Sequence, residues 1–403
     1  MKFNTIEEAV ADLARGKMVV LCDDEDRENE GDLVCAGSHV SPAVINFMLK
    51  HGRGLICAPI DDSRAARLKL PLMASDQEDR MLAHCNFTVS VDARRGVTTG
   101  ISAADRAQAV KTLLNPKSKS HDLVRPGHMF PLIGRHGGVL VRTGHTEGSL
   151  DLMRLAGLPE VAVICEILDD DGTMLRGKRL MEFTKKHELK IITIKDLIHY
   201  RRMREKLIYR AVESTLPTEY GEFQMIVYKT KIDDYEHIAL VRGTIKKGDI
   251  VPTRVHSECI TGEVFHSRKC DCRAQLDTAL KYIASKGSGV LIYMRQEGRG
   301  IGLVNKLKAY NLQDSQGLDT VEANAKLGFK ADLREYGIGA QILADIGLSE
   351  IALMTNNPKK IVGLEGYGLK IVDRIPLEIR PDDRTRRYLA TKKKKMGHML
   401  KFV

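Results

Sequence analysis

The strongest constraint on the fold is a charged, helix-forming segment, IKDLIHYRRMREKLIYRA (194–211), which divides two stretches of different pattern. Before it, short apolar runs alternate irregularly with helix-like stretches, and after it a new β-rich pattern begins beyond Pro217. The chain of 403 residues is also too long for one core, because single cores stop growing at roughly 250–300 residues. We therefore predict two domains, residues 1–204 and 205–403.

Both predicted domains combine the apolar runs of strands with the spacing of amphipathic helices. In the first domain we expect helices over 5–14, 42–50 and 101–114, and strands at MVVLC (18–22), GLICAPI (54–60), FTVSVD (87–92), GVLVRT (138–143), VAVICEIL (161–168) and KIITI (190–194). In the second domain we expect strands at FQMIVYK (223–229), EHIALVRG (236–243) and VLIYMR (290–295), and a helix over 272–285. This irregular alternation favours an α+β (mixed α/β) fold, with a mixed sheet and flanking helices in each domain, over a strict βαβ repeat.

The net charge of +10 predicts an anionic partner, either nucleic acid or phosphorylated small molecules. Basic runs at 201–206 and 392–395 supply part of this excess and are typical of solvated surface. A nucleic-acid-binding protein is disfavoured, because aromatic residues make up only 5% of the chain and no helix-turn-helix or zinc-finger spacing occurs. No apolar run approaches the roughly 20 residues that cross a bilayer, and the N-terminus resembles no signal peptide, so we expect a cytoplasmic protein without a membrane partner.

Between two apolar runs, the segment DDEDRENEGD (23–32) places seven carboxylates in ten positions. One interpretation is a solvated hairpin turn whose charge serves solubility. The other is a site for a hard divalent cation, since Mg²⁺ prefers oxygen ligands and takes one or two protein carboxylates besides water and substrate. Arg27 favours the second interpretation, because a guanidinium can hold a substrate anion beside the metal.

A second polar cluster, RTGHTEGSLDL (142–152), follows the predicted strand GVLV. Glycines, hydroxyls and a cation at a strand end are groups that bind phosphate. The same domain contains RPGHMFPL (125–132). The sequence favours two roles for His128 equally: a structural histidine in a Pro-Gly turn, or a catalytic group. Glu166 lies in the apolar run VAVICEIL, where an unpaired buried carboxylate is costly.

In that order, DDEDRENEGD, RPGHMFPL and RTGHTEGSLDLMRLAGL resemble 3,4-dihydroxy-2-butanone 4-phosphate synthase over about the first 200 residues. The resemblance implies conversion of D-ribulose 5-phosphate to 3,4-dihydroxy-2-butanone 4-phosphate and formate, with Mg²⁺ or Mn²⁺. It assigns Glu28 and His145 as metal ligands and Asp32, His128 and Glu166 as catalytic groups. The implied sugar-phosphate contacts are Arg27, Glu28, Asp32, Arg142, Thr143, Gly144, His145, Thr146 and Glu166.

The second domain contains a cluster of three cysteines, Cys259, Cys270 and Cys272. In a reducing compartment such a cluster indicates a metal site rather than disulfides. Three thiolates without a fourth cysteine leave an open position on Zn²⁺, as in catalytic sites. His256 or His266 is available to close the shell, so the spacing alone leaves a structural zinc site equally open.

Several further motifs together resemble GTP cyclohydrolase II from about residue 206 onward: RVHSE (254–258), QEGRGIGL (296–303), DTVEAN (319–324), KADLREYGIGAQIL (330–343) and TNNPKK (355–360). The resemblance implies that Zn²⁺ on the three cysteines, together with Mg²⁺, opens the imidazole ring of GTP. The implied products are 2,5-diamino-6-hydroxy-4-(5-phosphoribosylamino)pyrimidine, formate and pyrophosphate. The implied GTP contacts are Arg254, Val255, His256, Ser257, Glu258, Gln275, Glu297, Gly298, Arg299, Thr320, Thr355 and Lys360.

The same resemblance makes Asp332 a proton acceptor and Arg334 a nucleophile toward the α-phosphorus. A guanidinium with a pKa above about 12 is a poor nucleophile, so phosphate stabilisation is an equal role for Arg334. Both resemblances together predict a lyase and a hydrolase of riboflavin biosynthesis in one chain, both active, acting on small molecules as a homodimer. A nucleotide hydrolase of another base specificity is the alternative for the second domain.

Overall fold

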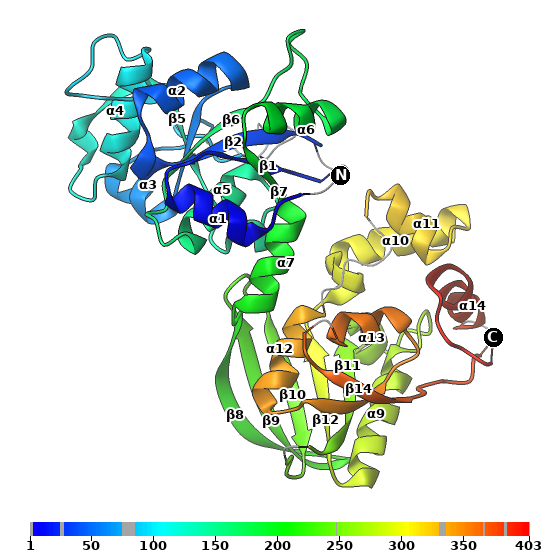
Figure 1. Cartoon of the computed structure of the whole chain (residues 1–403). Coiled ribbons are helices and arrows are strands. Elements are labelled where there is room, and N and C mark those ends of the chain that lie inside the picture. Colours follow the sequence, from blue (N-terminus) through cyan, green and yellow to red (C-terminus); the bar gives the residue numbers. More distant parts are fainter. Residues whose placement is uncertain are drawn as a thin grey trace. The chain divides into compact units, whose positions relative to one another are not determined.

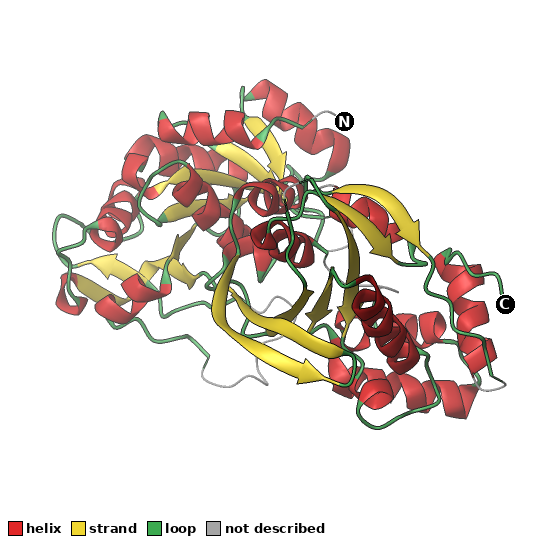
Figure 2. Ribbon diagram, turned by 90° about the horizontal axis from the view of Figure 1, so that it is seen from below, coloured by secondary structure: helices red, strands yellow, loops and turns green. Residues whose placement is uncertain are grey.

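The computed structural model describes residues 3–24, 28–74, 85–246, 248–329, 336–365, 367–382 and 385–402. The chain folds as two compact units, Met1–Arg204 and Glu205–Val403. Each unit is built on one seven-stranded mixed sheet with helices against it (Figures 1 and 2). The predicted fold class, two tandem domains with mixed sheets and flanking helices, is confirmed.

The N-terminal sheet has the strand order β4-β5-β3-β6-β2-β1-β7 and mixes parallel with antiparallel pairs. Its strands are β1 (Val19–Cys22), β2 (Gly31–Ala36), β3 (Cys57–Ile60), β4 (Val91–Ala93), β5 (Leu123–Ile133), β6 (Ala162–Glu166) and β7 (Lys190–Thr193). Its helices are α1 (Ile6–Ala14), α2 (Pro42–Phe47), α3 (Asp62–Leu68), α4 (Ala103–Leu114), α5 (His145–Leu155), α6 (Gly177–Lys186) and α7 (Ile194–Arg204).

Both faces of this sheet are buried, because alternate residues of a strand point to opposite faces. On β1, Val19 and Leu21 belong to the apolar cluster that α1, α5 and α7 contribute to. Val20 and Cys22 belong to the cluster on the other face, to which α2, α3, α4 and α6 contribute. Since the first nine residues of α5 are all buried, this helix positions its side chains deep within the unit.

The C-terminal sheet has the order β14-β13-β11-β12-β10-β9-β8, in which β14, β13, β11 and β12 run parallel. Its strands are β8 (Ile208–Thr218), β9 (Gly221–Thr230), β10 (Glu236–Arg242), β11 (Ile250–Ser257), β12 (Gly289–Met294), β13 (Glu350–Met354) and β14 (Lys370–Ile375). Its helices are α8 (Ile260–Glu263), α9 (Cys272–Lys286), α10 (Gly302–Gln316), α11 (Thr320–Lys326), α12 (Gly337–Ile346), α13 (Pro358–Glu365) and α14 (Thr385–Met396).

Helices α9 and α12 cover opposite faces of this sheet (Figure 1). Ala279 and Ile283 of α9 share an apolar cluster with Leu291 of β12. On the other face, a Cβ added to Gly339 of α12 would lie 3.4 Å from a methyl group of Val255. The two faces of β11 therefore have different surroundings, which decides which of its side chains can reach a ligand.

Two predicted elements are wrong. The expected strand GVLVRT contains a turn of 3₁₀-helix, Gly138–Leu140, because the N–H of Val139 donates to Asp151 on α5 instead of to a neighbouring strand. The expected helix over 194–211 ends at Arg204, and β8 begins at Ile208. Pro217 lies inside β8, which tolerates it because β8 is an edge strand.

A buried ion pair ties α7 to α5. Asp151 of α5 is 2.7 Å from Arg201 of α7 and 2.9 Å from Arg154, and Arg201 also donates to the carbonyl of Gly137 at 2.8 Å. The Asp151 side chain is fully buried, and that of Arg201 is only 5% exposed. Removing one partner of such a pair leaves a buried charge without its counter-ion.

We expect Arg201→Met to lower the free energy of unfolding by about 3 kcal/mol, the low end for a broken buried pair because Asp151 keeps Arg154. Urea unfolding of the full chain measures this loss. The control is Lys195→Met, an exposed position on the same helix, for which we expect less than about 0.5 kcal/mol. Equal losses in both variants would contradict a special role for the pair.

Candidate active sites

The acidic segment forms the loop between β1 and β2. Arg27 lies outside the described residues. Asp23 organises the loop, since its carboxylate accepts the backbone N–H of Glu28 at 3.2 Å and that of Glu30 at 2.8 Å. Because Asp23 is itself buried, the loop is more than a solvated hairpin turn.

Ligand atoms of Asp23, Glu28 and His145 all lie within 4.8 Å of one another. His145 is the first residue of α5, so the helix brings it to the acidic loop. Two carboxylates and an imidazole are a donor set that suits Mg²⁺ or Mn²⁺. The structure thus brings together the two predicted ligands and adds Asp23, whose only signal in the sequence is its place in the acidic run.

Asp32 and Glu166 lie opposite each other on the antiparallel strands β2 and β6. Burial raises the pKa of Asp32 well above its ordinary value, and the charges of Glu166 and Glu28 raise it further. The Asp32 carboxylate is also 3.8 Å from Nδ1 of His145. In the described part of the chain, Oδ1 of Asp32 and Oε2 of Glu166 are buried without a hydrogen-bond partner. Such oxygens are available to a substrate or a proton.

Close packing holds the Glu166 carboxylate in place. A Cβ added to Gly54 would lie 2.6 Å from Oε2 of Glu166, so only glycine leaves this space open. The backbone at Gly54 therefore lies directly against the Glu166 carboxylate. Glycine is common at positions where a ligand or another part of the backbone approaches this closely.

His128 lies within strand β5, not in a Pro-Gly turn as one interpretation of the sequence had it. Its Nδ1 is 2.7 Å from Oδ2 of Asp92, and its backbone N–H donates to Oδ1 of the same carboxylate at 2.9 Å. This partner orients the imidazole and leaves Nε2 for a proton transfer. Within the described residues, no hydrogen bond or ion pair joins His128 to Asp32 or Glu166. Asp92 carried no signal in the sequence.

The predicted phosphate contacts surround the N-terminus of α5. Arg142 is 2.5 Å from Glu147, and a Cβ on Gly144 would collide with the Arg142 guanidinium. Thr143 is exposed, whereas Thr146 is buried. The N-terminal backbone N–H groups of a helix attract anions, so this end of α5 suits a phosphate next to the metal ligands.

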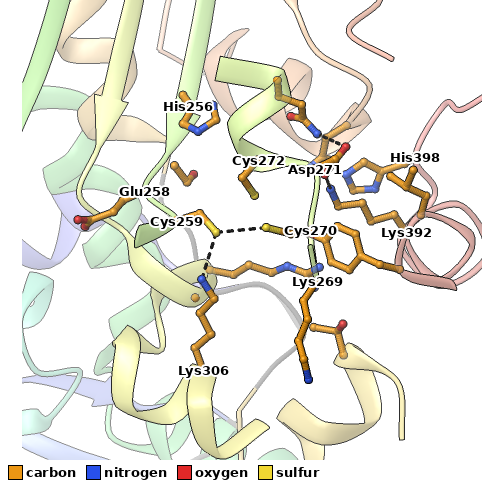
Figure 3. A pocket seen from close by; sticks show the side chains of 18 of the residues that line it. His256, Glu258, Cys259, Lys269, Cys270, Asp271, Cys272, Lys306, Lys392 and His398 are labelled. Carbon is orange, nitrogen blue, oxygen red and sulfur yellow. Dashed lines mark hydrogen bonds and ion pairs between the residues drawn. The ribbon is translucent and has the colours of Figure 1, made fainter. Parts of the chain in front are cut away.

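The three predicted zinc ligands also meet. Sγ atoms of Cys259, Cys270 and Cys272 lie within 4.8 Å of one another, and the first two are 3.6 Å apart (Figure 3). Tetrahedral zinc with Zn–S bonds of about 2.3 Å requires sulfurs about 3.8 Å apart, so the cluster fits the ion. A Cβ on Gly262 would lie 2.7 Å from Sγ of Cys270, which shows how closely the chain packs around the thiols.

Neither histidine that the sequence offered as a fourth ligand belongs to this cluster. His256 is buried with its Nε2 2.7 Å from Glu263, and His266 contacts Arg273. The described residues therefore place three thiolates together with no fourth protein ligand beside them. This is the open arrangement of a catalytic zinc site rather than the closed shell of a structural one.

A buried lysine missed in the sequence balances the thiolates. Nζ of Lys306 on α10 lies 3.1 Å from Sγ of Cys259 and 2.8 Å from Oε1 of Glu297. The hydrogen bond with the Cys270 thiol and the charge of Lys306 both lower the pKa of Cys259. Glu297 also accepts the N–H of Ile260 at 2.7 Å, so contact with a ligand requires it to share or exchange these bonds.

The cluster lies at the carboxyl ends of three parallel strands, where open α/β sheets bind ligands. Cys259 follows β11, Glu297 follows β12 and Thr355 follows β13. A pocket of about 140 Å³ opens there. The predicted GTP contacts that line it are Arg254, His256, Ser257, Glu258, Gln275, Glu297, Gly298, Arg299, Thr320, Thr355 and Lys360.

The Val255 side chain is not part of this pocket, because alternation along β11 turns it toward α12. Its carbonyl contributes instead by accepting Nζ of Lys360 at 2.7 Å. Asp332 and Arg334 lie outside the described residues. Pocket residues to which the sequence analysis assigned no contact include Lys306, Tyr310, Asn324, Asn357, Lys392 and His398.

Two family models match the chain. One, described as 3,4-dihydroxy-2-butanone 4-phosphate synthase, matches residues 7–200, and the other, described as GTP cyclohydrolase II, matches residues 209–376. No helix among the described residues is long and apolar enough to cross a membrane.

Relatives match over nearly the full length. The riboflavin biosynthesis protein RibBA of Bacillus cereus (strain B4264) is 55% identical over 398 residues, which is 99% of each chain, and RibBA of Bacillus mycoides (strain KBAB4) is equally similar. The crystal structure of RibBX from A. baumannii, described as a two domain 3,4-dihydroxy-2-butanone 4-phosphate synthase, superposes with a TM-score of 0.70 at 37% identity. It covers 93% of this chain and 100% of that one.

We expect Asp23→Asn to weaken Mn²⁺ binding by about 10-fold or more, because it replaces one carboxylate of the Asp23, Glu28 and His145 cluster by a neutral amide, a weaker ligand for the cation. Titration of the protein with Mn²⁺, followed by electron paramagnetic resonance, measures the affinity. The control is Asp24→Asn, which removes the same charge from an exposed neighbour. If both substitutions weaken binding equally, only the net charge of the loop matters.

We expect one equivalent of zinc per chain, retained after dialysis, and its loss in Cys272→Ser, because two thiolates hold the ion too weakly. Elemental analysis of the purified protein measures the content. Cys85→Ser, in the N-terminal unit, should keep the full equivalent. Zinc retained in Cys272→Ser would contradict the three-thiolate site.

Proposed function

This chain belongs to the family of bifunctional riboflavin biosynthesis proteins, with a 3,4-dihydroxy-2-butanone 4-phosphate synthase domain followed by a GTP cyclohydrolase II domain, and we propose that both domains are active. The first converts D-ribulose 5-phosphate to 3,4-dihydroxy-2-butanone 4-phosphate and formate. The second converts GTP to 2,5-diamino-6-hydroxy-4-(5-phosphoribosylamino)pyrimidine, formate and pyrophosphate. The observation that carries the proposal is a separate cluster of metal-ligand side chains in each unit.

In the N-terminal unit, Asp32 and Glu166 are the groups best placed to move protons. Burial raises the pKa of Asp32 and so favours its protonated form, which can give a proton to a substrate oxygen, and Glu166 beside it is placed to accept one from carbon. When bound at Asp23, Glu28 and His145, a divalent cation stabilises negative charge on the substrate oxygens. His128, oriented by Asp92, is a third proton carrier.

Substrate binding in this unit is assigned to the N-terminus of α5 and the residues before it. Arg142 and the helix N–H groups attract the phosphate, and Arg27 is proposed to hold the sugar from the acidic loop. This placement sets the carbon chain between the phosphate site and the metal ligands. The orientation is therefore decided by the phosphate at one end of the substrate and by the metal ligands that face its ketone end.

In the C-terminal unit, the pocket residues hold GTP with its base toward the thiolate cluster. Cys259, Cys270 and Cys272 hold Zn²⁺, which supplies the Lewis acidity for hydrolysis when bound. Arg254, Arg299 and Lys360 supply positive charge that attracts the triphosphate of GTP, which binds together with Mg²⁺. Asp332 is proposed as a proton acceptor, and Arg334 either as a nucleophile or as a phosphate stabiliser.

We also propose a homodimer and a cytoplasmic location. All eight cysteines are free thiols, as in proteins of a reducing compartment. The basic balance of the chain is explained by two phosphorylated substrates, so nucleic acid is not among the proposed partners.

The test is separate incubation of the full chain with ribulose 5-phosphate and with GTP, and mass spectrometry of both products. We expect His145→Ala to lower only the first activity and Cys272→Ser only the second, each by more than about 100-fold because each removes a direct metal ligand. In each variant, the activity that is kept shows that the unaltered unit is folded and active. ATP and xanthosine triphosphate are the control substrates for base specificity.

Wild-type protein that releases pyrophosphate from GTP but leaves ribulose 5-phosphate unchanged would show that the first domain is inactive. Loss of both activities in either variant would mean that the two sites are not independent. Turnover of ATP in preference to GTP would favour a nucleotide hydrolase of another base specificity.

A further inference from the structure

One wall of the GTP pocket comes from a segment that the GTP cyclohydrolase II model, which ends at residue 376, does not cover. The segment includes α14 and contributes Tyr388, Lys392 and His398 to the pocket lining (Figure 3). The cysteines and residues at the strand ends line the same pocket. The pocket is therefore incomplete without residues that follow the last strand of the sheet.

Both ends of this segment are fixed by one buried asparagine. The side chain of Asn356 donates to the carbonyl of Leu377 at 2.7 Å and accepts the N–H of Leu377 at 3.1 Å. The backbone carbonyl of Asn356 accepts the N–H of Met399 at 2.9 Å. Asn356 directly follows the predicted GTP contact Thr355 and itself lines the pocket. These three hydrogen bonds, called here the Asn356 clamp, therefore attach the segment to the pocket.

The centre of the segment is joined to the zinc ligands by an ion pair. Nζ of Lys392 is 3.0 Å from Oδ1 of Asp271, the residue between Cys270 and Cys272. The Lys392 side chain is 12% exposed and that of Asp271 only 5%. A carboxylate buried to this degree beside three thiolates needs a counter-charge, and Lys392 provides it.

The ion pair continues as a chain of hydrogen bonds along the pocket wall. Oδ2 of Asp271 accepts Nε2 of Gln275 at 2.6 Å, and Oε1 of Gln275 accepts Arg254 at 2.6 Å. Asp271 therefore connects the C-terminal segment with two predicted substrate contacts on α9 and β11 as well as with two thiolates. A change at Lys392 reaches all of them through one carboxylate.

We infer that the C-terminal segment is a working wall of the GTP site and that Lys392 is a positioning residue. By holding Asp271, it fixes the two thiolates on either side and the Gln275–Arg254 pair. The inference rests on the proposed function, since the reaction affected is the opening of GTP. Groups that orient metal ligands from outside the coordination shell are worth 10–100-fold in metal affinity or activity.

The test compares Lys392→Met with Lys394→Met, an exposed lysine on the same helix. We expect zinc to pass to a chromogenic chelator about 10–100-fold faster from Lys392→Met, and its kcat for GTP to fall about as much with a smaller change in KM. Lys392→Arg should restore most of both, because it keeps the charge. Conversion of ribulose 5-phosphate by the same samples reports that the N-terminal unit is folded, and their melting temperatures report the folding of the C-terminal unit.

A Lys392→Met protein with the zinc release and GTP turnover of Lys394→Met, or with a lower melting temperature as its only change, would overturn the inference. If Lys392→Met does not fold, Asp271→Asn breaks the same pair without altering α14 and should speed zinc release alike. If wild-type protein does not turn over GTP, the proposed function fails, while the rate of zinc release still decides the role of Lys392.

Discussion

Ionisable groups of the same sign are buried close together in both units, and this constraint organises the rest of the structure. The neighbouring strands β1, β2 and β6 of one sheet place three carboxylates close together, those of Asp23, Asp32 and Glu166. Three thiols meet at the strand ends of the other sheet. Like charges in low dielectric repel strongly, so each cluster is stable only with a proton, a cation or a lysine beside it. A metal ion relieves this repulsion, which is why both clusters suit one.

Residue types and their order predicted several side chains that the structure brings together, but they did not predict the neighbours of those side chains. Glu28 and His145 were predicted as a pair because each belongs to a long motif, and the structure brings them together. Asp92 and Lys306 carried no such signal, because their roles depend on packing between strands and helices that no local pattern encodes. Val255 shows the opposite case, since a residue within a binding motif faces the other side of its strand.

The fold class followed from the sequence, whereas two element types did not. Local apolar runs specify that a segment is buried, and strand or helix is then decided by its partners. In GVLVRT the partner is the Asp151 carboxylate, which takes a backbone N–H that a strand would need. In 194–211 the helix-forming pattern is overridden beyond Arg204, because pairing with β9 extends the sheet by one strand. Both errors arise from tertiary contacts that outweigh local propensity.

The Asn356 clamp has a consequence for how the chain folds while it is being translated. A chain emerging from the ribosome has its complete N-terminal unit well before α14 has been translated, so the first site can assemble early. The second site lacks a wall until residues 388–400 have been added and have folded back onto the loop after β13. A nascent chain therefore passes through a stage at which the first candidate site is complete and the pocket of the second still lacks one wall.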